Sequence, residues 1–176
     1  MCFALKSTHR FYRDWTCQMH LSDTFTFQAA QLAVWDALMD IEGIAAALGV
    51  HRIVPLAGRA QLWRATIRFK WLLINSTASY LVQMSEVNAP HSYRLTVSGE
   101  GRQSLVSGTG VIRLNALSNT HTRLDWHAES AFAPALQRVA QPLIKQTVST
   151  LSRTFFSRLA AYISAQPKQQ VQPVNG

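Results

Sequence analysis

Hydrophobic and polar positions alternate along much of the chain. Between residues 61 and 71 one set of alternate side chains is apolar, and the other set is basic or hydroxylated. The apolar set is Trp63, Ala65, Ile67, Phe69 and Trp71. A period of two predicts a strand with one covered and one solvated face, which is typical of an antiparallel sheet. Further strands are predicted at 21–27, 74–87, 93–97, 108–114 and 123–129, with turns at NAPHS and SNTH.

Other segments change to the helical period. Residues 30–39 place Leu32, Trp35 and Leu38 on one predicted stripe, and Asp40 is positioned to cap a second short helix that Gly49 ends. A long helix is predicted at 142–164. Its broad apolar face comprises Leu143, Ile144, Val148, Leu151, Phe155, Leu159 and Tyr162.

The order of these elements predicts the fold class. A helix face this broad needs an apolar partner, and the sheet offers one. We therefore expect an α+β, helix-grip fold: a curved antiparallel β-sheet around a long C-terminal α-helix, with two short helices after the first strand. Residues 19–164 form this domain, 1–18 a flexible extension and 165–176 a disordered tail rich in Gln and Pro. The sequence does not distinguish Met1 from Met19 as the initiator methionine.

No apolar run reaches the roughly 18 residues that a membrane-spanning helix needs. Charged residues interrupt the first 15 positions before a signal-peptide core can form, so a cytoplasmic location is predicted. Seventeen Lys and Arg against nine Asp and Glu give a net charge of +8. The basic residues are scattered, which argues against nucleic acid as a partner and leaves a weak attraction to anionic membrane lipids.

Motifs for chemistry are sparse. The six histidines show neither HxH nor HExxH spacing, and two cysteines cannot complete a zinc site, so no metal is predicted. Neither a GxSxG motif nor a phosphate-binding glycine loop occurs. We therefore predict no cofactor and name no catalytic residue. The polar candidates for an enzymatic alternative are Asn75, Tyr80, Glu86 and Arg113.

The segment from Met19 to Ser164 resembles the carbon monoxide dehydrogenase G-subunit family, within the START-like superfamily of polyketide cyclases and lipid-transfer domains. Trp35 and Asp40 occupy the places of the family's Trp and helix-ending Asp. The resemblance is carried by FTFQAAQLAVWDALMD, WRATIRF, SYRLTVSGEG, SGTGVIRL, HTRLDW and LIKQTVSTLSRTFF.

A sheet curved around a helix encloses a space that large side chains either fill or line, and the pattern leaves both alternatives open. The residues expected to line a ligand pocket are Trp35, Leu38, Ile44, Leu48, Trp63, Ile67, Phe69, Tyr80, Val82, Met84, Leu95, Trp126, Leu151 and Phe155. In this interpretation the helices at 30–48 form a wall and a lid.

The resemblance implies non-catalytic binding of a lipophilic small molecule of the quinone, lipid or isoprenoid class. It also implies a link to a molybdenum-containing hydroxylase partner, at the inner face of the bacterial membrane. Two alternatives remain open: a cyclase- or hydrolase-like enzyme that uses the same pocket, and an interaction domain with a filled interior.

Overall fold

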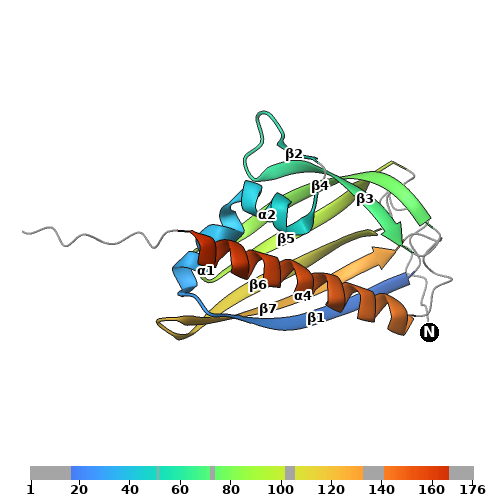
Figure 1. Ribbon diagram of the computed structural model, residues 1–176. Helices are drawn as coiled ribbons and strands as arrows, with labels where there is room; N and C mark the ends of the chain where they lie inside the picture. The colour runs from blue at the N-terminus through green and yellow to red at the C-terminus, as the bar shows by residue number, and fades with distance from the viewer. Residues whose placement is uncertain (1–16, 51, 72–73, 102–105, 133–140, 167–176) are drawn as a thin grey trace, which may run out of the picture.

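The computed structural model describes residues 17–50, 52–71, 74–101, 106–132 and 141–166 (Figure 1). Within these residues, seven strands form one sheet in the order β1-β7-β6-β5-β4-β3-β2, and every pairing is antiparallel. The strands are β1 (Cys17–Phe27), β2 (Arg52–Pro55), β3 (Leu62–Trp71), β4 (Ile74–Asn88), β5 (Ser92–Glu100), β6 (Val106–Ser118) and β7 (His121–Phe132). The helices are α1 (Gln31–Met39), α2 (Ile41–Leu48) and α4 (Gln141–Ala165).

The strand register carries one apolar face across the whole sheet. Directly paired residues point to the same side. Trp63 pairs with Val82, and Val82 pairs in turn with Val97. The same face continues through Ile112, which pairs with Trp126. The alternation predicted for β3 is therefore confirmed for the described side chains, and its polar set lies on the opposite face.

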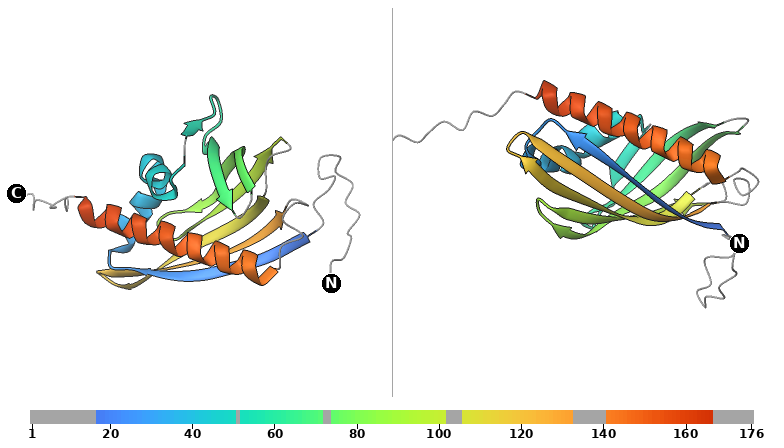
Figure 2. Two further views of the ribbon diagram at one scale, coloured as in Figure 1. Left: turned by 45° about the vertical axis from the view of Figure 1, so that its right-hand side comes forward. Right: turned by 90° about the horizontal axis from the view of Figure 1, so that it is seen from below.

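The long helix α4 runs diagonally across this apolar, concave face (Figure 2). It lies over the β1 and β7 side of the sheet, while β2 and β3 stand beyond it on the other side. The helices α1 and α2 pack against its C-terminal end. This arrangement confirms the predicted α+β, helix-grip fold.

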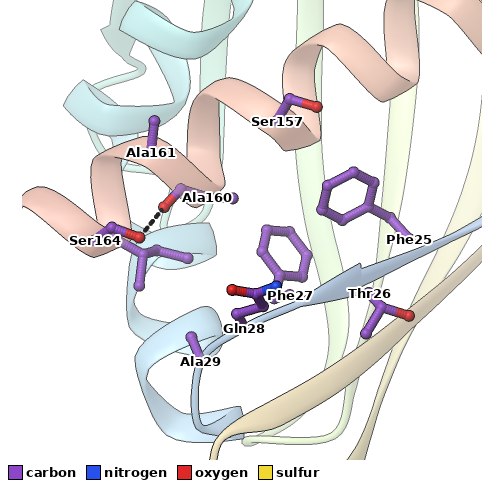
Figure 3. A pocket seen from close by; sticks show the side chains of 10 residues that line it. Phe25, Thr26, Phe27, Gln28, Ala29, Ser157, Ala160, Ala161 and Ser164 are labelled. Carbon is purple, nitrogen blue, oxygen red and sulfur yellow. Dashed lines mark hydrogen bonds between the residues drawn. The ribbon is translucent and has the colours of Figure 1, made fainter.

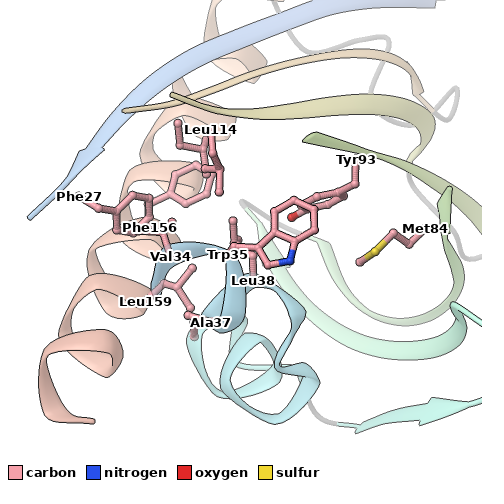
Figure 4. Close-up of a cluster of buried hydrophobic side chains, with 12 residues drawn as sticks. Phe27, Val34, Trp35, Ala37, Leu38, Met84, Tyr93, Leu114, Phe156 and Leu159 are labelled. Carbon is pink, nitrogen blue, oxygen red and sulfur yellow. The ribbon is translucent and has the colours of Figure 1, made fainter. Parts of the chain in front are cut away.

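The core is solid at each end of α4. The larger cluster joins α1, the C-terminal part of α4 and the sheet (Figure 4). Its buried members include Phe27, Val34, Trp35, Leu38, Leu114, Leu124, Phe156 and Leu159. The smaller cluster consists of Met19, Phe132 and Ile144, near the N-terminal end of α4. Both ends of the helix are thus anchored by close packing.

Three leucines that the sequence placed on the covered faces of two helices are exposed in the structure. Leu32 is 61% exposed, and α1 buries Val34 and Ala37 beside Trp35 and Leu38. In α4, Leu143 and Leu151 are 41% and 64% exposed. Phe156 is 5% exposed instead, because its side of α4 faces the sheet, where its ring contacts Phe25 and Phe27 of β1.

Strand boundaries also differ from the prediction. The first strand begins at Cys17, four residues before the predicted start at Leu21, and it pairs with β7 along its full length. The short strand β2 was not predicted, because four residues with both ends exposed carry too little alternation to be recognised.

The second short helix begins and ends as predicted. The Asp40 carboxylate accepts a hydrogen bond from the Glu42 backbone N–H at 3.0 Å, and Gly49 ends the helix with φ of 65°. A positive φ at this position is the usual reason for glycine.

None of the helices in the described ranges combines the length and apolarity needed to cross a membrane. Most of the predicted N-terminal extension and C-terminal tail lies outside the described residues, so the predicted domain boundaries remain predictions.

Candidate ligand-binding site

The concave face is incompletely covered between the two core clusters. Along β7, Leu124 and Phe132 are 0% and 6% exposed, whereas Trp126, Ala128 and Ser130 between them are only partly buried. Apolar side chains that face inward yet stay partly accessible indicate that this face is not fully covered, although Trp63, Leu95, Ile112, Trp126 and Phe155 pack against the larger core cluster. We call the partly buried side chains that face the concave side the inner strip. Its large members are Trp63, Ile67, Val82, Leu95, Val97, Ile112, Trp126 and Phe155.

Small residues form part of the floor of the inner strip. Gly108 pairs with Ser130, and Gly110 pairs with Ala128, so β6 and β7 present little side-chain volume there. A Cβ atom on Gly108 would lie 2.3 Å from the carbonyl oxygen of Glu129, which no real structure tolerates. Close packing of the two strands therefore requires glycine at position 108, and the absence of a side chain there leaves more room above the sheet.

One carboxylate lies on the same concave face. Asp23 Oδ2 accepts a hydrogen bond from Ser149 Oγ at 2.8 Å, and its Oδ1 accepts one from the Thr24 backbone N–H at 2.9 Å. Arg153 Nε lies 3.5 Å from Oδ2. The Thr24 and Ser149 hydrogen bonds hold the pKa of Asp23 below its usual value, so the group is ionised at neutral pH.

Trp126 is the direct cross-strand neighbour of Asp23. Its Nε1 is buried and has no hydrogen-bond partner among the described residues. Arg94 Nε is the other buried nitrogen without a well-aligned hydrogen bond. It lies 2.8 Å from Glu86 Oε1, so the negative charge of that carboxylate balances the charge of the guanidinium. An unsatisfied buried donor costs about 1–3 kcal/mol, so the indole N–H needs an explanation.

A cavity of about 210 Å³ adjoins Trp126. It lies between β1 and the N-terminal half of α4 and is lined by His20, Leu21, Ser22, Trp126, Lys145, Val148 and Ser149. His20 and Lys145 are exposed, whereas Trp126 and Ser149 are partly buried. The cavity thus has His20 and Lys145 at its rim, and the Trp126 ring and the Ser149 side chain deeper in.

A second cavity, of about 320 Å³, lies between the end of β1 and the last turns of α4 (Figure 3). It is lined by Phe25, Thr26, Phe27, Gln28, Ala29, Ser157, Ala160, Ala161, Ile163 and Ser164. No residue of the predicted site takes part in it.

The helix α2 is tied to α4 at both of its ends. The Tyr162 hydroxyl donates a hydrogen bond to Asp40 Oδ2, and the Arg158 guanidinium donates one to the carbonyl oxygen of Ala47 at 3.3 Å. Gly43 lies beneath the Tyr162 ring, where an added Cβ would be 2.8 Å from a ring carbon. The predicted lid is therefore docked on α4 by specific contacts.

The predicted site residues divide into groups. Four of them are buried: Trp35 and Leu38 on α1, and Tyr80 and Met84 on β4. Partly buried on the inner strip are Trp63, Ile67, Val82, Leu95, Trp126 and Phe155. Ile44 is half-buried on α2, and the side chain of Phe69 lies outside the described part of the chain.

The structure does not bring Leu48 and Leu151 into the interior. Leu48 is 49% exposed and Leu151 is 64% exposed. Leu151 lies seven residues before Arg158 and therefore on nearly the same side of α4, the side that faces α2. Both leucine side chains are therefore on the surface, and their prediction as pocket residues was wrong.

Asp23, Ser149 and Lys145 were missed as site residues. Asp23 shares the alternation of Leu21, Phe25 and Phe27, so a charge on the covered face of a strand was the available signal. Among the described residues, no group of three His, Cys, Asp or Glu side chains is placed to hold a metal ion.

The sequence profile of one family, CoxG, described as the G subunit of carbon monoxide dehydrogenase, matches residues 24–164. This match spans most of the chain. The chain belongs to the CoxG family. A comparison with curated protein sequences found no match.

Solved structures share the fold of this CoxG family member at low sequence identity. A conserved protein from Geobacillus kaustophilus is 19% identical with a TM-score of 0.76, covering 83% of this chain and 95% of that one. The Zhui aromatase/cyclase from Streptomyces sp. R1128 is 13% identical with a TM-score of 0.61, covering 91% and 99%. A START superfamily protein from Mycobacterium smegmatis is 12% identical with a TM-score of 0.65, covering 82% and 97%. At these identities the likeness establishes the START-like fold alone.

Proposed function

We propose that the protein binds a lipophilic small molecule, of the quinone, lipid or isoprenoid class, against the inner strip without transforming it. The single observation that carries the proposal is the strip of inward-facing apolar side chains that stay partly exposed beside the larger core cluster. Burying about 300 Å² of apolar ligand surface at about 25 cal/mol per Å² would contribute about 7.5 kcal/mol, before the cost of association.

A binding role accounts for the polar groups better than an enzymatic one. Asp23 accepts hydrogen bonds on both carboxylate oxygens, and these lower its pKa, so it is a weak proton acceptor at neutral pH. Tyr80 is 1% exposed, and Glu86 and Arg113 are exposed. These candidates do not converge on one point, which acid–base catalysis requires.

The proposal extends to the setting of the protein. Family membership supports an accessory role beside a molybdenum-containing hydroxylase. We also propose a cytoplasmic location. The net charge of +8 supports peripheral contact with the anionic inner face of the membrane. Co-purification of the hydroxylase with the tagged full chain from its native host, with and without about 0.5 M salt to screen charge contacts, tests this part.

Solvent extraction of the purified protein followed by mass spectrometry tests the binding role. We expect a co-purified lipophile from the wild type. Ala128→Phe places a ring on the inner strip and should reduce the amount extracted by about tenfold. His127→Phe places the same ring on the exposed face of the same strand, and should change nothing.

The proposal would be abandoned if the wild type yields no lipophile from its native host. Equal yields from Ala128→Phe and wild type, with both variants folded by circular dichroism, would place any bound molecule elsewhere.

A further inference from the structure

The side of the sheet formed by β2 and β3 has an uneven balance of charge. Between Glu42 and Glu86 the sequence contains no Asp or Glu, and this stretch includes β2, β3 and most of β4. Its arginines are all exposed: Arg52, Arg59, Arg64 and Arg68. Basic residues that are separated along the sequence therefore gather on one side of the folded chain.

The strand register places three of these arginines on one face. Arg52 of β2 is paired with Thr66 of β3, and Arg64 and Arg68 lie two residues to either side of Thr66. Directly paired residues share a face, and so do alternate residues of one strand, so the three side chains leave the sheet on the same side. That side is the outer one, opposite the concave face over which α4 runs (Figure 2).

A single acidic residue is paired with this group among the described side chains. The Glu100 carboxylate accepts hydrogen bonds from Arg64 Nε at 2.8 Å and from Arg64 Nη2 at 3.1 Å. This pairing neutralises Arg64. Arg52 and Arg59 take part in no ion pair with a described residue. The outer face of β2 and β3 therefore keeps an excess of positive charge.

The loop that joins β2 to β3 adds an apolar element to this surface. It projects beyond the edge of the sheet (Figure 1, Figure 2). Ala57, Gly58 and Ala60 are exposed and Leu56 is partly buried, so Arg59 lies among small or apolar residues. A guanidinium beside apolar groups matches the interfacial region of a bilayer, where anionic phosphates meet hydrocarbon. Nucleic acid would offer the phosphates without the hydrocarbon.

We propose that the outer face of β2 and β3, together with the loop at 56–61, is the surface through which the protein contacts an anionic phospholipid membrane. Arg52 and Arg59 bind lipid phosphates, and the loop enters the headgroup layer. This inference rests on the proposed peripheral contact and adds to it a defined surface. Protection of a sheet edge against pairing would account for Arg52 on β2, but not for Arg59 in the loop.

Co-sedimentation of the full chain with vesicles tests this surface. Phosphatidylcholine vesicles with about 30% phosphatidylglycerol supply the anionic phosphates, and pure phosphatidylcholine vesicles are the neutral reference. We expect the wild type to bind the anionic vesicles at least about tenfold more tightly at low salt, and to be released by about 0.5 M salt.

Arg52→Gln combined with Arg59→Gln removes two charges from the surface and should weaken binding to the anionic vesicles about thirtyfold. Arg113→Gln combined with Lys145→Gln is the matched control, because it lowers the net charge equally from exposed positions on β6 and α4. The control should lose less than about threefold, since salt screens charges that lie far from the membrane. Circular dichroism checks that both variants are folded.

A second measurement uses the wild type alone. Amide hydrogen exchange in the loop at 56–61 should slow by about threefold or more when anionic vesicles are added, because membrane contact limits local opening. Exchange in the turn at 118–121 between β6 and β7 should stay unchanged.

The possible results separate this inference from the proposed membrane contact. If the wild type binds anionic vesicles but the variant at Arg52 and Arg59 binds as tightly as the control, or exchange in the loop does not slow, the inference is overturned and the contact stands. If duplex DNA at the same phosphate concentration binds the wild type more tightly than the vesicles do, the partner is nucleic acid and the inference is wrong. If the wild type does not distinguish the two kinds of vesicle, both the inference and the proposed membrane contact fail.

Discussion

The hydroxyl of Tyr162 near the end of α4 donates a hydrogen bond to the carboxylate of Asp40, the residue that caps α2. The same carboxylate also accepts the Glu42 backbone N–H. One side chain therefore both begins the helix and attaches it to α4. Because α2 belongs to the wall and lid that we predicted from the sequence, this attachment would govern how firmly that segment is held.

Tyr162→Phe should loosen α2 without disturbing the sheet. The variant loses one hydrogen bond to a charged group that is partly exposed, so we expect a loss of about 1 kcal/mol in the free energy of unfolding. Amide hydrogen exchange should accelerate in α2 more than in β6 or β7. Ser164→Ala removes another hydroxyl from the same end of α4, one that bonds only to its own helix, and serves as the control. Unchanged exchange in α2 would show that the hydrogen bond does not hold the helix.

Gly43→Ala should destabilise the protein although alanine favours helices. Ala is preferred over Gly by about 1 kcal/mol in a helix interior, but here its Cβ would lie 2.8 Å from a ring carbon of Tyr162. The contact forces α2 away from α4, and urea unfolding should report a net loss. In a Tyr162→Leu background the ring is absent, and the same substitution should become neutral or stabilising. Equal effects in the two backgrounds would contradict the contact.

The stability of the α2 attachment should fall in acid. The Tyr162 hydrogen bond is the main cause that holds the pKa of Asp40 below its ordinary value of 3.8. A group with a depressed pKa in the folded state stabilises the protein above its unfolded pKa, and the stabilisation is lost as pH falls through the folded pKa. Urea unfolding from about pH 6 to about pH 2.5 should therefore show a steeper loss below about pH 4 for the wild type than for Asp40→Asn. Parallel curves would rule out this contribution.

Much of the fold could be predicted from local patterns. The alternation of residues 63–71 identified the covered face of β3, and Asp40 and Gly49 marked both ends of α2. Both signals are local: the first comes from the two-residue period of a strand, and the second from the chemistry of helix ends. They do not depend on where distant segments lie.

The helix faces were harder to predict, because a broad apolar stripe fits several rotations. In α4 both Leu151 and Phe156 are apolar, and the tertiary contacts of Phe156 with Phe25 and Phe27 decide which of the two is covered. The candidate site is harder still. The hydrogen bond that Ser149 donates to Asp23 joins two residues that lie 126 positions apart in the chain. No local pattern contains that information.

Thr122 connects β7 to the segment that leads into α1. Its side chain is 0% exposed, and its hydroxyl donates a hydrogen bond to the carbonyl oxygen of Ala29 at 2.8 Å. Thr122→Val keeps the shape but leaves that carbonyl without the bond, so urea unfolding should show a loss of about 1–3 kcal/mol. Thr26→Val, at an exposed position on the neighbouring strand, should stay within about 0.5 kcal/mol of the wild type. If the two variants are equally stable, the Thr122 hydroxyl does not hold α1 against the sheet, and the wall that contains Trp35 relies on apolar packing alone.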